Sequence, residues 1–226
     1  MSKKVFLFGI SGRMGEELKK QIDSMDEFVC IGGYSRKTAN LDDVERPDVV
    51  IDFSLPETFP VLVNFIDKHK CALVSGTTGL NPDQKEKLKV LSKNSPVFWS
   101  ANMSMGVFLM AQLTEVLASY DDQYSLQVEE THHIHKKDKP SGTAIIIEDA
   151  AKKRTSKLKE TISIREGEIF GIHKFTASNE FESIEIRHEA FNRGLFAKGA
   201  LDVALWLVNQ PSGLYEMGNY FENRRS

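Results

Sequence analysis

Short apolar runs alternate with longer segments of helical periodicity over the first hundred residues of the chain. The runs have the length of buried strands, and the segments between them are long enough to be crossover helices. This alternation predicts a doubly wound parallel sheet with helices on both faces. The predicted strands are 5–8, 28–33, 48–53, 72–75 and 97–99, and the predicted helices are 12–24, 56–68 and 82–93.

The pattern changes after residue 103. Helical spacing over 104–119 precedes an alternating strand over 124–131, and a helix over 141–157 precedes strand-like stretches over 161–165, 168–177 and 183–191. Because no helix separates these last stretches, we expect an antiparallel or mixed sheet. The chain is therefore predicted to be an α/β protein with a first, Rossmann-like domain over 1–103 and a second, smaller α+β domain over 104–193. We expect the C-terminal segment, about 194–226, to pack back on the first domain.

A glycine-rich segment, Gly9 to Gly15, follows the first predicted strand and opens the first predicted helix. Glycine lets the backbone turn tightly and approach a pyrophosphate, whose charge meets the unpaired N–H groups at the helix start. We therefore predict that the first domain binds a dinucleotide. The spacing is Gly-x-x-Gly-x-x-Gly, with Ser11 in the middle of the turn, so a glycine-rich turn without a ligand is the alternative.

The second predicted strand ends at Ser35, Arg36 and Lys37, where NAD-binding proteins usually place a carboxylate for the ribose hydroxyls. These side chains suit a 2′-phosphate, so we predict that NADPH is at least as good a cofactor as NADH. The alternative is a solvated turn. Loops 76–79 and 100–104 follow later strands at the same sheet edge, where their small and polar residues either bind a nicotinamide carboxamide or form ordinary turns.

The segment 132–144 combines three histidines, a run of lysines and a Pro-Ser-Gly-Thr turn that is typical of a helix start. Ser141 would cap the helix, and Gly142 and Thr143 would offer backbone N–H groups to a carboxylate. Lys136 and His133 add positive charge, which favours a dicarboxylate ligand and keeps imidazoles available as proton donors near neutral pH. A capped helix beside a solvated lysine run is the alternative.

Strand alternation through 131–136 would place His133 and His135 on one face of a strand and His132 with Ile134 on the other. Three close histidines also raise the question of zinc. The neighbouring lysines would repel a cation and no second ligand cluster is evident, so we predict no metal. A histidine held in the core by hydrogen bonds is the alternative for His135.

The composition limits the class of partner. A formal charge of −3 over 226 residues and a pI near 6.1 make any cationic site local, which argues against nucleic acid. No run reaches the roughly 18 apolar residues of a membrane span, and the apolar run after Lys4 is too short for a signal peptide. Cys30 and Cys71 cannot make a disulfide framework, so we expect free thiols in a cytoplasmic protein, with a redox pair as the alternative.

The segment 130–144, Glu-Thr-His-His-Ile-His-Lys-Lys-Asp-Lys-Pro-Ser-Gly-Thr-Ala, closely resembles the signature of the 4-hydroxy-tetrahydrodipicolinate reductase (dihydrodipicolinate reductase) family of lysine and diaminopimelate biosynthesis. Further segments at 12–15, 52–54, 76–79, 101–102, 188–190 and 193–200 follow in the family's order, so the resemblance extends over nearly the whole chain. There are departures: Ser11 replaces a glycine common in the family, and the stretch between Lys37 and Asp48 is shorter than in many members.

The resemblance implies an oxidoreductase that uses NADPH or NADH to reduce 4-hydroxy-tetrahydrodipicolinate, a cyclic dicarboxylate, to tetrahydrodipicolinate with loss of water. It implies a homotetramer assembled through the sheet of the second domain. The implied catalytic residues are His132, the general acid/base, and Lys136, the second proton donor, and the implied substrate-binding residues are His133, Ser141, Gly142 and Thr143. The implied cofactor-binding residues are Gly9, Ile10, Ser11, Gly12, Arg13, Met14, Arg36, Phe53, Gly76, Thr77, Thr78, Ala101, Asn102 and Met103.

Two rival functions fit the same two-domain plan. A related NAD(P)-dependent amino-acid dehydrogenase, such as one acting on aspartate, would not need both Lys136 and the Ser-Gly-Thr turn for a second carboxylate. A catalytically inactive NAD(P) sensor would use the second domain for association, and the intact His132 and Lys136 argue against it.

Overall fold

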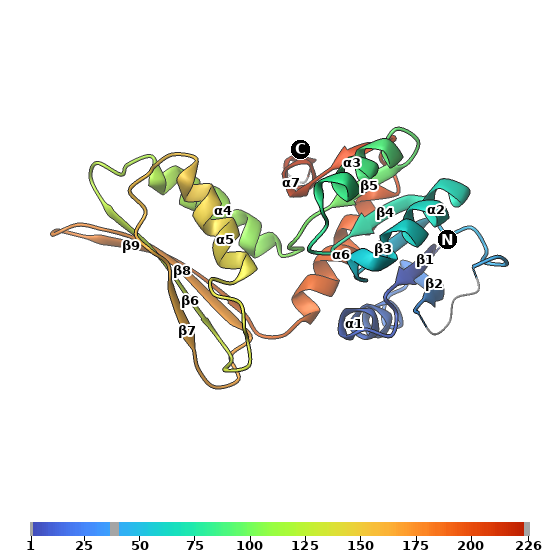
Figure 1. The fold of residues 1–226 in the computed structure, drawn as a ribbon, viewed down its shortest axis with the longest axis horizontal. Coiled ribbons are helices and arrows are strands. Elements are labelled where there is room, and N and C mark those ends of the chain that lie inside the picture. The colour runs from blue at the N-terminus through green and yellow to red at the C-terminus, as the bar shows by residue number, and fades with distance from the viewer. Residues whose placement is uncertain (1, 37–40, 224–226) are drawn as a thin grey trace. The chain divides into compact units, whose positions relative to one another are not determined.

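The computed structural model of the chain describes residues 2–36 and 41–223. These residues divide into two compact units, each with its own sheet (Figure 1). The first unit comprises the residues up to Met103 together with those from Phe196 onward, and the second runs from Ser104 to Leu195. In the described part of the chain, no helix is long and apolar enough to cross a membrane.

The first unit is built on a parallel sheet of six described strands in the order β10-β5-β4-β3-β1-β2. The chain runs from β1 to β2 on one side and continues with β3 on the other, so a topological switch point lies between β1 and β3. The predicted doubly wound sheet is confirmed. The strands are β1 (Lys3–Phe8), β2 (Phe28–Tyr34), β3 (Val49–Asp52), β4 (Ala72–Ser75), β5 (Pro96–Trp99) and β10 (Gly213–Tyr215).

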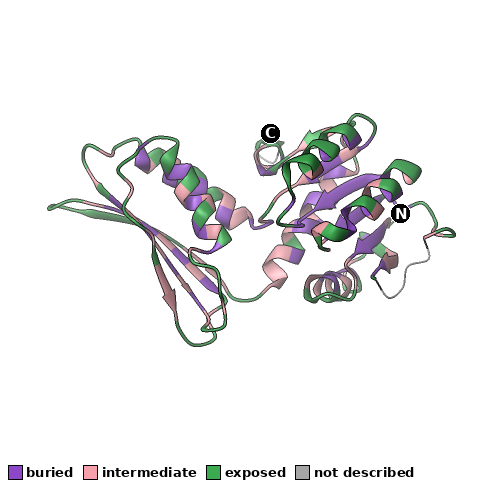
Figure 2. Ribbon diagram, viewed as in Figure 1, coloured by how far each residue is buried: buried purple, intermediate pink, exposed green. Residues whose placement is uncertain are grey.

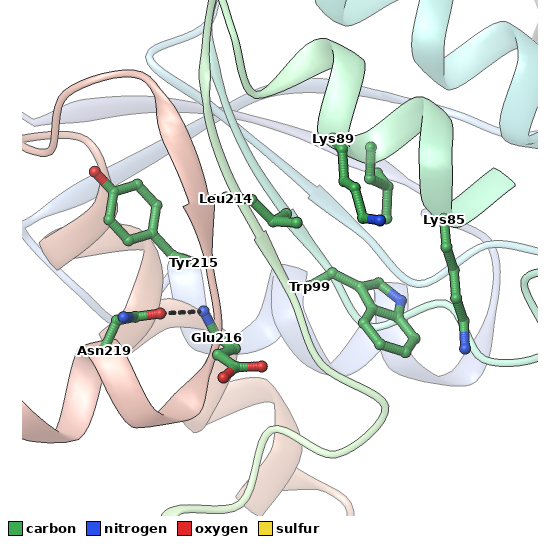
Figure 3. A pocket seen from close by; sticks show the side chains of 8 residues that line it. Lys85, Lys89, Trp99, Leu214, Tyr215, Glu216 and Asn219 are labelled. Carbon is green, nitrogen blue, oxygen red and sulfur yellow. Dashed lines mark hydrogen bonds between the residues drawn. The ribbon is translucent and has the colours of Figure 1, made fainter. Parts of the chain in front are cut away.

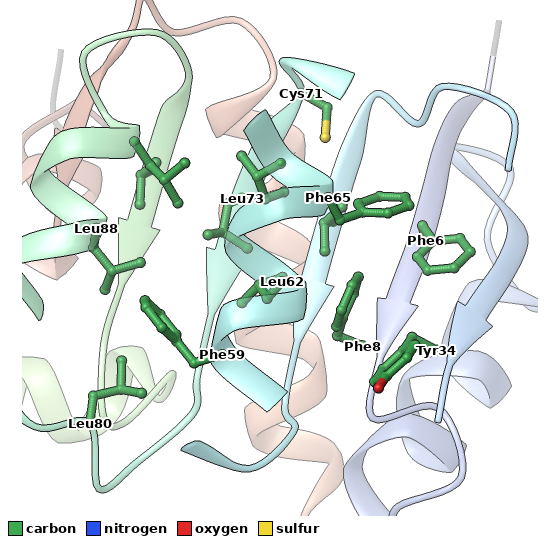
Figure 4. Packing of buried hydrophobic residues seen from close by; sticks show 14 residues of the cluster. Phe6, Phe8, Tyr34, Phe59, Leu62, Phe65, Cys71, Leu73, Leu80 and Leu88 are labelled. Atoms are coloured by element: carbon green, nitrogen blue, oxygen red, sulfur yellow. The ribbon is translucent and has the colours of Figure 1, made fainter. Parts of the chain in front are cut away.

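Helices cover both faces of this sheet, which explains why the central strands β3 and β4 are buried throughout and apolar up to their last residues (Figures 1 and 2). Figure 4 shows α2 lying over the sheet, with Leu62 and Phe65 among the side chains packed between them, and the Phe65 ring stacks on Phe6 with centroids 4.9 Å apart. The helices are α1 (Arg13–Ile22), the 3-10 turn η1 (Pro56–Thr58), α2 (Phe59–His69), α3 (Pro82–Leu91), α6 (Gly194–Leu207) and α7 (Met217–Asn223).

Two features of the first unit differ from the prediction. The predicted helix 56–68 is divided into η1 and α2, because Pro60 has no N–H to donate and so favours a place in the first turn of a helix. The strand β10 and the helix α7 were not predicted. β10 has three residues, and pairing with β5, rather than any local periodicity, makes it a strand.

The second unit packs α4 (Met105–Ala118) and α5 (Gly142–Lys152) on one face of a mixed sheet, in the order β7-β6-β8-β9. Strands β6 and β7 are parallel, and the pairs β6/β8 and β8/β9 are antiparallel, which confirms the predicted mixed sheet. The strands are β6 (Ser125–His132), β7 (Ile162–Arg165), β8 (Gly171–Ser178) and β9 (Ser183–Ala190).

Two predicted boundaries in the second unit are wrong. Helix α5 ends at Lys152, not near 157, because the Thr155 hydroxyl binds Asp121 and accepts the N–H of Lys157, which competes with helical hydrogen bonds. Strand β8 begins at Gly171, not at 168, because the chain turns at Gly167, whose φ is +50°.

Candidate functional site

The turn between β1 and α1 lies at the switch point of the parallel sheet. Gly9 has φ +83°, and a Cβ there would lie 2.6 Å from the carbonyl oxygen of Phe53, so only glycine fits. A Cβ on Gly15 would lie 2.3 Å from the Gly9 carbonyl oxygen, so this glycine lets α1 pack against the turn. Gly12 is the N-cap of α1, and no side-chain hydrogen bond caps the helix there. This arrangement leaves the positive end of the helix suited to an anion.

A cavity of about 320 Å³ opens beside this turn, at the carboxyl ends of β1, β2 and β3. It brings together five of the predicted cofactor residues, and Arg36 is the charged side chain among the described residues that line it. Ser35, which was considered with Arg36, lines it too, whereas Lys37 lies outside the described residues. The lining residues are Gly9, Ser11, Gly12, Tyr34, Ser35, Arg36, Phe53, Ser54, Leu55 and Thr58.

The other predicted cofactor residues do not line this cavity. Ile10 lies in the β1–α1 turn, and its N–H donates to the Tyr34 carbonyl (3.3 Å). Arg13 and Met14 are the first residues of α1. The rest follow β4 and β5, and they are Gly76, Thr77, Thr78, Ala101, Asn102 and Met103.

Asp52, at the end of β3, connects the loops that follow β3 and β4 and was not singled out as a site residue. Its carboxylate is fully buried and accepts hydrogen bonds from the hydroxyls of Ser75 (2.7 Å) and Thr77 (2.8 Å) and from the backbone N–H of Ser54 (3.0 Å). Burial raises the pKa of Asp52, and these hydrogen bonds partly offset that effect. An acidic residue at the end of an otherwise apolar run was the available signal for this role.

The loop after β4 packs closely against the loop after β3. A Cβ on Gly76 would lie 2.4 Å from the Phe53 ring, so the ring rests directly on the Gly76 backbone. The indole N–H of Trp99 donates to the Thr77 carbonyl (3.1 Å) and thereby ties this loop to β5. Thr78 is exposed.

The three predicted residues in the loop after β5 differ in exposure, and Asn102 is half-buried. Ala101 is exposed, and the Ser100 hydroxyl donates to the Asn102 carbonyl (2.7 Å). The Met103 side chain is 1% exposed, and a Cβ on Gly199 of α6 would lie 1.9 Å from the Met103 carbonyl oxygen. The side chain of Met103 therefore belongs to the core, and its carbonyl packs against α6.

A second cavity of the first unit, about 310 Å³, lies between α3, β5 and β10 (Figure 3). The Lys85 ammonium is 4.9 Å from the centroid of the Trp99 ring at its wall. None of the predicted cofactor residues lines this cavity, so we do not assign the cofactor to it.

In the second unit, the buried face of β6 carries a carboxylate and an imidazole two residues apart. The His132 Nδ1–H donates to Glu130, whose side chain is fully buried. Glu130 also accepts from both terminal nitrogens of Arg165 on β7, at 3.0 and 2.8 Å. Burial alone would raise the pKa of Glu130, but the hydrogen bonds from Arg165, Ser163 and His132 outweigh it and hold the pKa below its usual value.

The His132 ring lies over the backbone of β8. A Cβ on Gly171 would lie 2.8 Å from His132 Nε2, so the glycine leaves the space that the imidazole occupies. The rings of His132, His173 on β8 and His188 on β9 form a row, which we call the histidine row. Their centroids are 5.0 Å apart from His132 to His173 and 6.1 Å apart from His173 to His188. Burial lowers the pKa of His132, although the Glu130 carboxylate opposes this effect.

Both helices of the second unit begin at a serine that also contacts a histidine of the sheet. The Ser141 hydroxyl accepts the N–H of Ala144, as predicted for a helix cap, and lies 3.1 Å from His173 Nε2. The Ser104 hydroxyl caps α4 and lies 3.4 Å from His188 Nε2. The start of each helix is thereby fixed on the buried face of the sheet.

The remaining predicted residues surround this start. Gly142 is exposed and Thr143 is half-buried in the first turn of α5. The Lys136 ammonium lies 2.9 Å from the Asp138 carboxylate, and the Lys136 side chain is 23% exposed. His133 is half-buried.

The predicted alternation of the histidines stops at His132, where β6 ends. Beyond it, the N–H of Lys136 bonds to the carbonyl of His133 (3.1 Å) in a turn. Ile134 and His135 are exposed, so Ile134 does not share the buried face with His132.

Comparison with known proteins places both units in one family. Residues 3–103 match the family model described as dihydrodipicolinate reductase, N-terminus, and residues 106–221 match that of the C-terminus. The chain belongs to the dihydrodipicolinate reductase family. Among its relatives are proteins named 4-hydroxy-tetrahydrodipicolinate reductase from Rickettsia rickettsii, 37% identical over 96% of this chain and 98% of the relative, and from Bdellovibrio bacteriovorus, 39% identical over 95% and 94%.

A dipicolinate-bound dihydrodipicolinate reductase from Paenisporosarcina shares the fold of this chain. The two structures superpose with a TM-score of 0.82 at 20% sequence identity, over 96% of this chain and 98% of the other. The parallel sheet and the mixed sheet of this chain therefore have the fold of that dihydrodipicolinate reductase.

No metal centre is evident in this member of the dihydrodipicolinate reductase family, as far as the described residues go. They contain no group of three or more His, Cys, Asp or Glu side chains that could hold a metal ion. The buried atoms without a hydrogen-bond partner in the described part of the chain instead include Nδ1 of His133, His173 and His188.

The histidine row predicts acid sensitivity in the stability of the second unit. Burial lowers the pKa of His173 to about 3, while an unfolded histidine titrates near 6.5. The unfolded state therefore binds the proton more tightly, and the stabilisation from a neutral His173 is lost as the pH falls below 6.5. We expect His173 to account for about 2 kcal/mol of the unfolding free energy lost between pH 7 and pH 5, measured by urea denaturation.

The variant His173→Gln should flatten that pH dependence, and His135→Gln, which changes an exposed histidine of the same unit, should leave it unchanged. An equally steep loss in His173→Gln would assign the acid sensitivity to other groups.

Proposed function

We propose that this chain is a 4-hydroxy-tetrahydrodipicolinate reductase, which uses a nicotinamide cofactor to reduce a cyclic dicarboxylate with loss of water. The observation that carries the proposal is the buried pair of Glu130 and His132, in the same unit as the Ser141 cap and Lys136. An aligned imidazole, an ammonium and a helix start together suit proton transfer to a substrate held by its carboxylates. The family membership and the names of the relatives support this chemistry.

A nicotinamide dinucleotide fits the first unit. The cavity at the switch point adjoins a glycine turn whose helix has no side-chain cap, which is the arrangement that receives a pyrophosphate. When bound, the cofactor supplies a hydride. Gly9 to Met14 would hold its pyrophosphate, Arg36 its adenosine end, and Phe53, Gly76 to Thr78 and Ala101 to Met103 the rest of the molecule.

The second unit would bind the substrate. Ser141, Gly142 and Thr143 at the start of α5 would hold one carboxylate with hydroxyl and N–H donors, and His133 would assist. Because His132 donates its Nδ1–H to Glu130, Nε2 is the atom left to exchange a proton. Once Nε2 is also protonated, His132 would act as the general acid that gives this proton to the enamine left by reduction, with Lys136 as the second proton donor.

A coupled assay tests the function. A dihydrodipicolinate synthase makes the substrate from pyruvate and aspartate semialdehyde, and the absorbance of NADPH or NADH is followed with this protein added. We expect oxidation that requires both enzymes. If the folded protein binds a cofactor but oxidises neither NADPH nor NADH, the reductase assignment is refuted and the amino-acid dehydrogenase or the sensor is favoured.

Arg36 should decide between the two cofactors. Among the described residues that line the cavity, Arg36 is the charged one and none is an Asp or a Glu. The guanidinium can pair with the 2′-phosphate of NADPH, whereas the ribose hydroxyls of NADH have no carboxylate to donate to. We expect Arg36→Ala to lower kcat/KM for NADPH about tenfold or more, the scale of a lost charge-assisted hydrogen bond, and to change that for NADH less than about twofold. Equal losses with both cofactors would refute the assignment.

The open face of the mixed sheet is where we propose that four copies assemble. Helices α4 and α5 cover one face, while the alternate residues of the other, among them Thr131, Ile172 and Thr176, remain half-buried in the single chain. A molar mass of four chains in sedimentation equilibrium would support the tetramer, and a monomer at micromolar concentration would refute it.

We also propose a cytoplasmic location, where thiols stay reduced. Cys30 and Cys71 are both free. Burial raises the pKa of Cys71 to about 12, which leaves this thiol inert and disfavours a redox pair.

A further inference from the structure

Arg165 is paired in register with His132, since β6 and β7 are parallel neighbours. Its side chain is 8% exposed, although it carries a permanent charge. A buried guanidinium requires partners that compensate for its lost hydration. Apart from the Ile164 carbonyl of its own strand, to which Nη1 donates at 2.7 Å, the partners of Arg165 fall into two groups. Each group leads to a different proton donor of the proposed reaction.

The first group is the Glu130 carboxylate. Arg165 Nη1 donates to Oε2 at 3.0 Å and Nη2 to Oε1 at 2.8 Å, a forked arrangement that fixes the plane of the carboxylate. The same carboxylate accepts the Nδ1–H of His132. The guanidinium therefore sets the orientation of the imidazole through one intermediate group.

The second group is the backbone of the loop that carries Lys136. Arg165 Nε donates to the Lys136 carbonyl at 3.2 Å, and Nη2 also donates to the Asp138 carbonyl. The Asp138 carboxylate in turn lies 2.9 Å from the Lys136 ammonium. The guanidinium therefore fixes the two ends of the short segment from which the ammonium projects.

We propose that Arg165 is the positioning residue that holds His132 and Lys136 in a fixed arrangement relative to one another. The proposal rests on the proposed function, because it concerns the two groups that would move protons there. Arg165 makes its hydrogen bonds to Glu130 and to the backbone, and it acts on the imidazole and the ammonium through these groups. Its role is therefore distinct from that of a catalytic residue.

A lysine could not take over this role. Its ammonium is a compact charge on a flexible stem, whereas the planar guanidinium has five donors in a rigid fork and here serves a carboxylate and three carbonyls at once. Arg165→Lys thus keeps the charge and removes the geometry. Arg165→Met removes both.

The charges around His132 allow a test that separates a positioning role of Arg165 from a merely structural one. Glu130 faces it from its own strand, Arg165 from β7, His173 from β8 and Lys136 from the loop. Loss of the guanidinium removes a positive charge and leaves the carboxylate, so Arg165→Met should raise the pKa of His132. Arg165→Lys should leave that pKa near its wild-type value.

Steady-state kinetics and NMR titration of His132 in the full-length protein test the proposal. We expect kcat to fall about tenfold or more in Arg165→Lys and about a hundredfold in Arg165→Met, the scale of misplaced catalytic groups, with the dissociation constant for NADPH unchanged. Arg154→Met is the matched control, because Arg154 pairs with Glu115 on the surface of the same unit, and its kcat should not change. A folded Arg165→Lys with wild-type kcat would overturn the proposal.

A measurement on the wild-type protein covers the case in which the variants fail to fold. The ring ¹⁵N shifts of neutral His132 should report the Nδ1–H tautomer, and the Nε–H of Arg165 should exchange slowly with solvent. An Nε2–H tautomer or a rapidly exchanging Arg165 would overturn the proposal. Neither measurement needs turnover, so an inactive wild-type enzyme would refute the proposed function without bearing on this result.

Discussion

His132→Gln is expected to lower turnover about a hundredfold or more, the usual scale for loss of a general acid. Glutamine can still donate a hydrogen bond to the Glu130 carboxylate, so the fold should survive while the titrating ring is lost. Lys136→Ala should have an effect of the same order, because it removes the second proton donor. Both are measured as kcat and KM in the coupled assay.

Each variant has a neighbour that serves as its control. His135→Gln makes the same chemical change three residues away, on a side chain that is 71% exposed. Lys137→Ala removes an exposed ammonium directly after Lys136. Both controls should retain wild-type turnover, and an unchanged rate in His132→Gln or Lys136→Ala would remove that residue from its proposed role.

Gly15→Ala is the second substitution with a large expected effect, although it adds one methyl group. The new Cβ would lie 2.3 Å from the Gly9 carbonyl oxygen and 2.6 Å from the Ile10 Cα, both backbone atoms that cannot rotate away. Helix α1 must therefore move relative to the turn. We expect a loss of about 1–3 kcal/mol in unfolding free energy. Since the same turn would receive the pyrophosphate, the dissociation constant for NADPH should also rise about tenfold or more.

Gly218→Ala provides the comparison, because a Cβ there meets no atom within 4 Å and the residue lies in helix α7. Alanine favours a helix over glycine by roughly 0.5–1 kcal/mol, so this variant should be as stable as the wild type or more stable. Calorimetry and cofactor titration distinguish the two cases. If Gly15→Ala binds NADPH as tightly as Gly218→Ala does, the turn is not the pyrophosphate site.

Periodicity was sufficient for elements that have a local cause. Strands β1 to β5 are short apolar runs between amphipathic helices, and their predicted bounds differ from the structure by two residues at most. The strand β10 has no such pattern: Leu214 is exposed, and pairing with β5 alone makes the segment a strand. Helix α5 was predicted too long, because the hydrogen bonds of Thr155 that end it involve a side chain 34 residues away.

The candidate site likewise has features with local causes and features that depend on long-range pairing. The Ser141 cap and the close approach of Gly15 to Gly9 depend on neighbours within a few residues, so the local sequence revealed them. The fork from Arg165 to Glu130 spans 35 residues and exists only because β7 pairs with β6 in one register. No spacing rule in a single sequence identifies such a partner.

The interrupted path of the chain bears on how the protein is made. The chain leaves the first unit after Met103 and returns to it at Phe196, so most of α6 and the edge strand β10 are added to this unit last. Synthesis from the N-terminus therefore releases all of the second unit while the first is still missing the helix that packs against Met103. The half that begins the chain is the last to be completed, and a fragment ending at residue 103 would leave the edge of β5 unpaired.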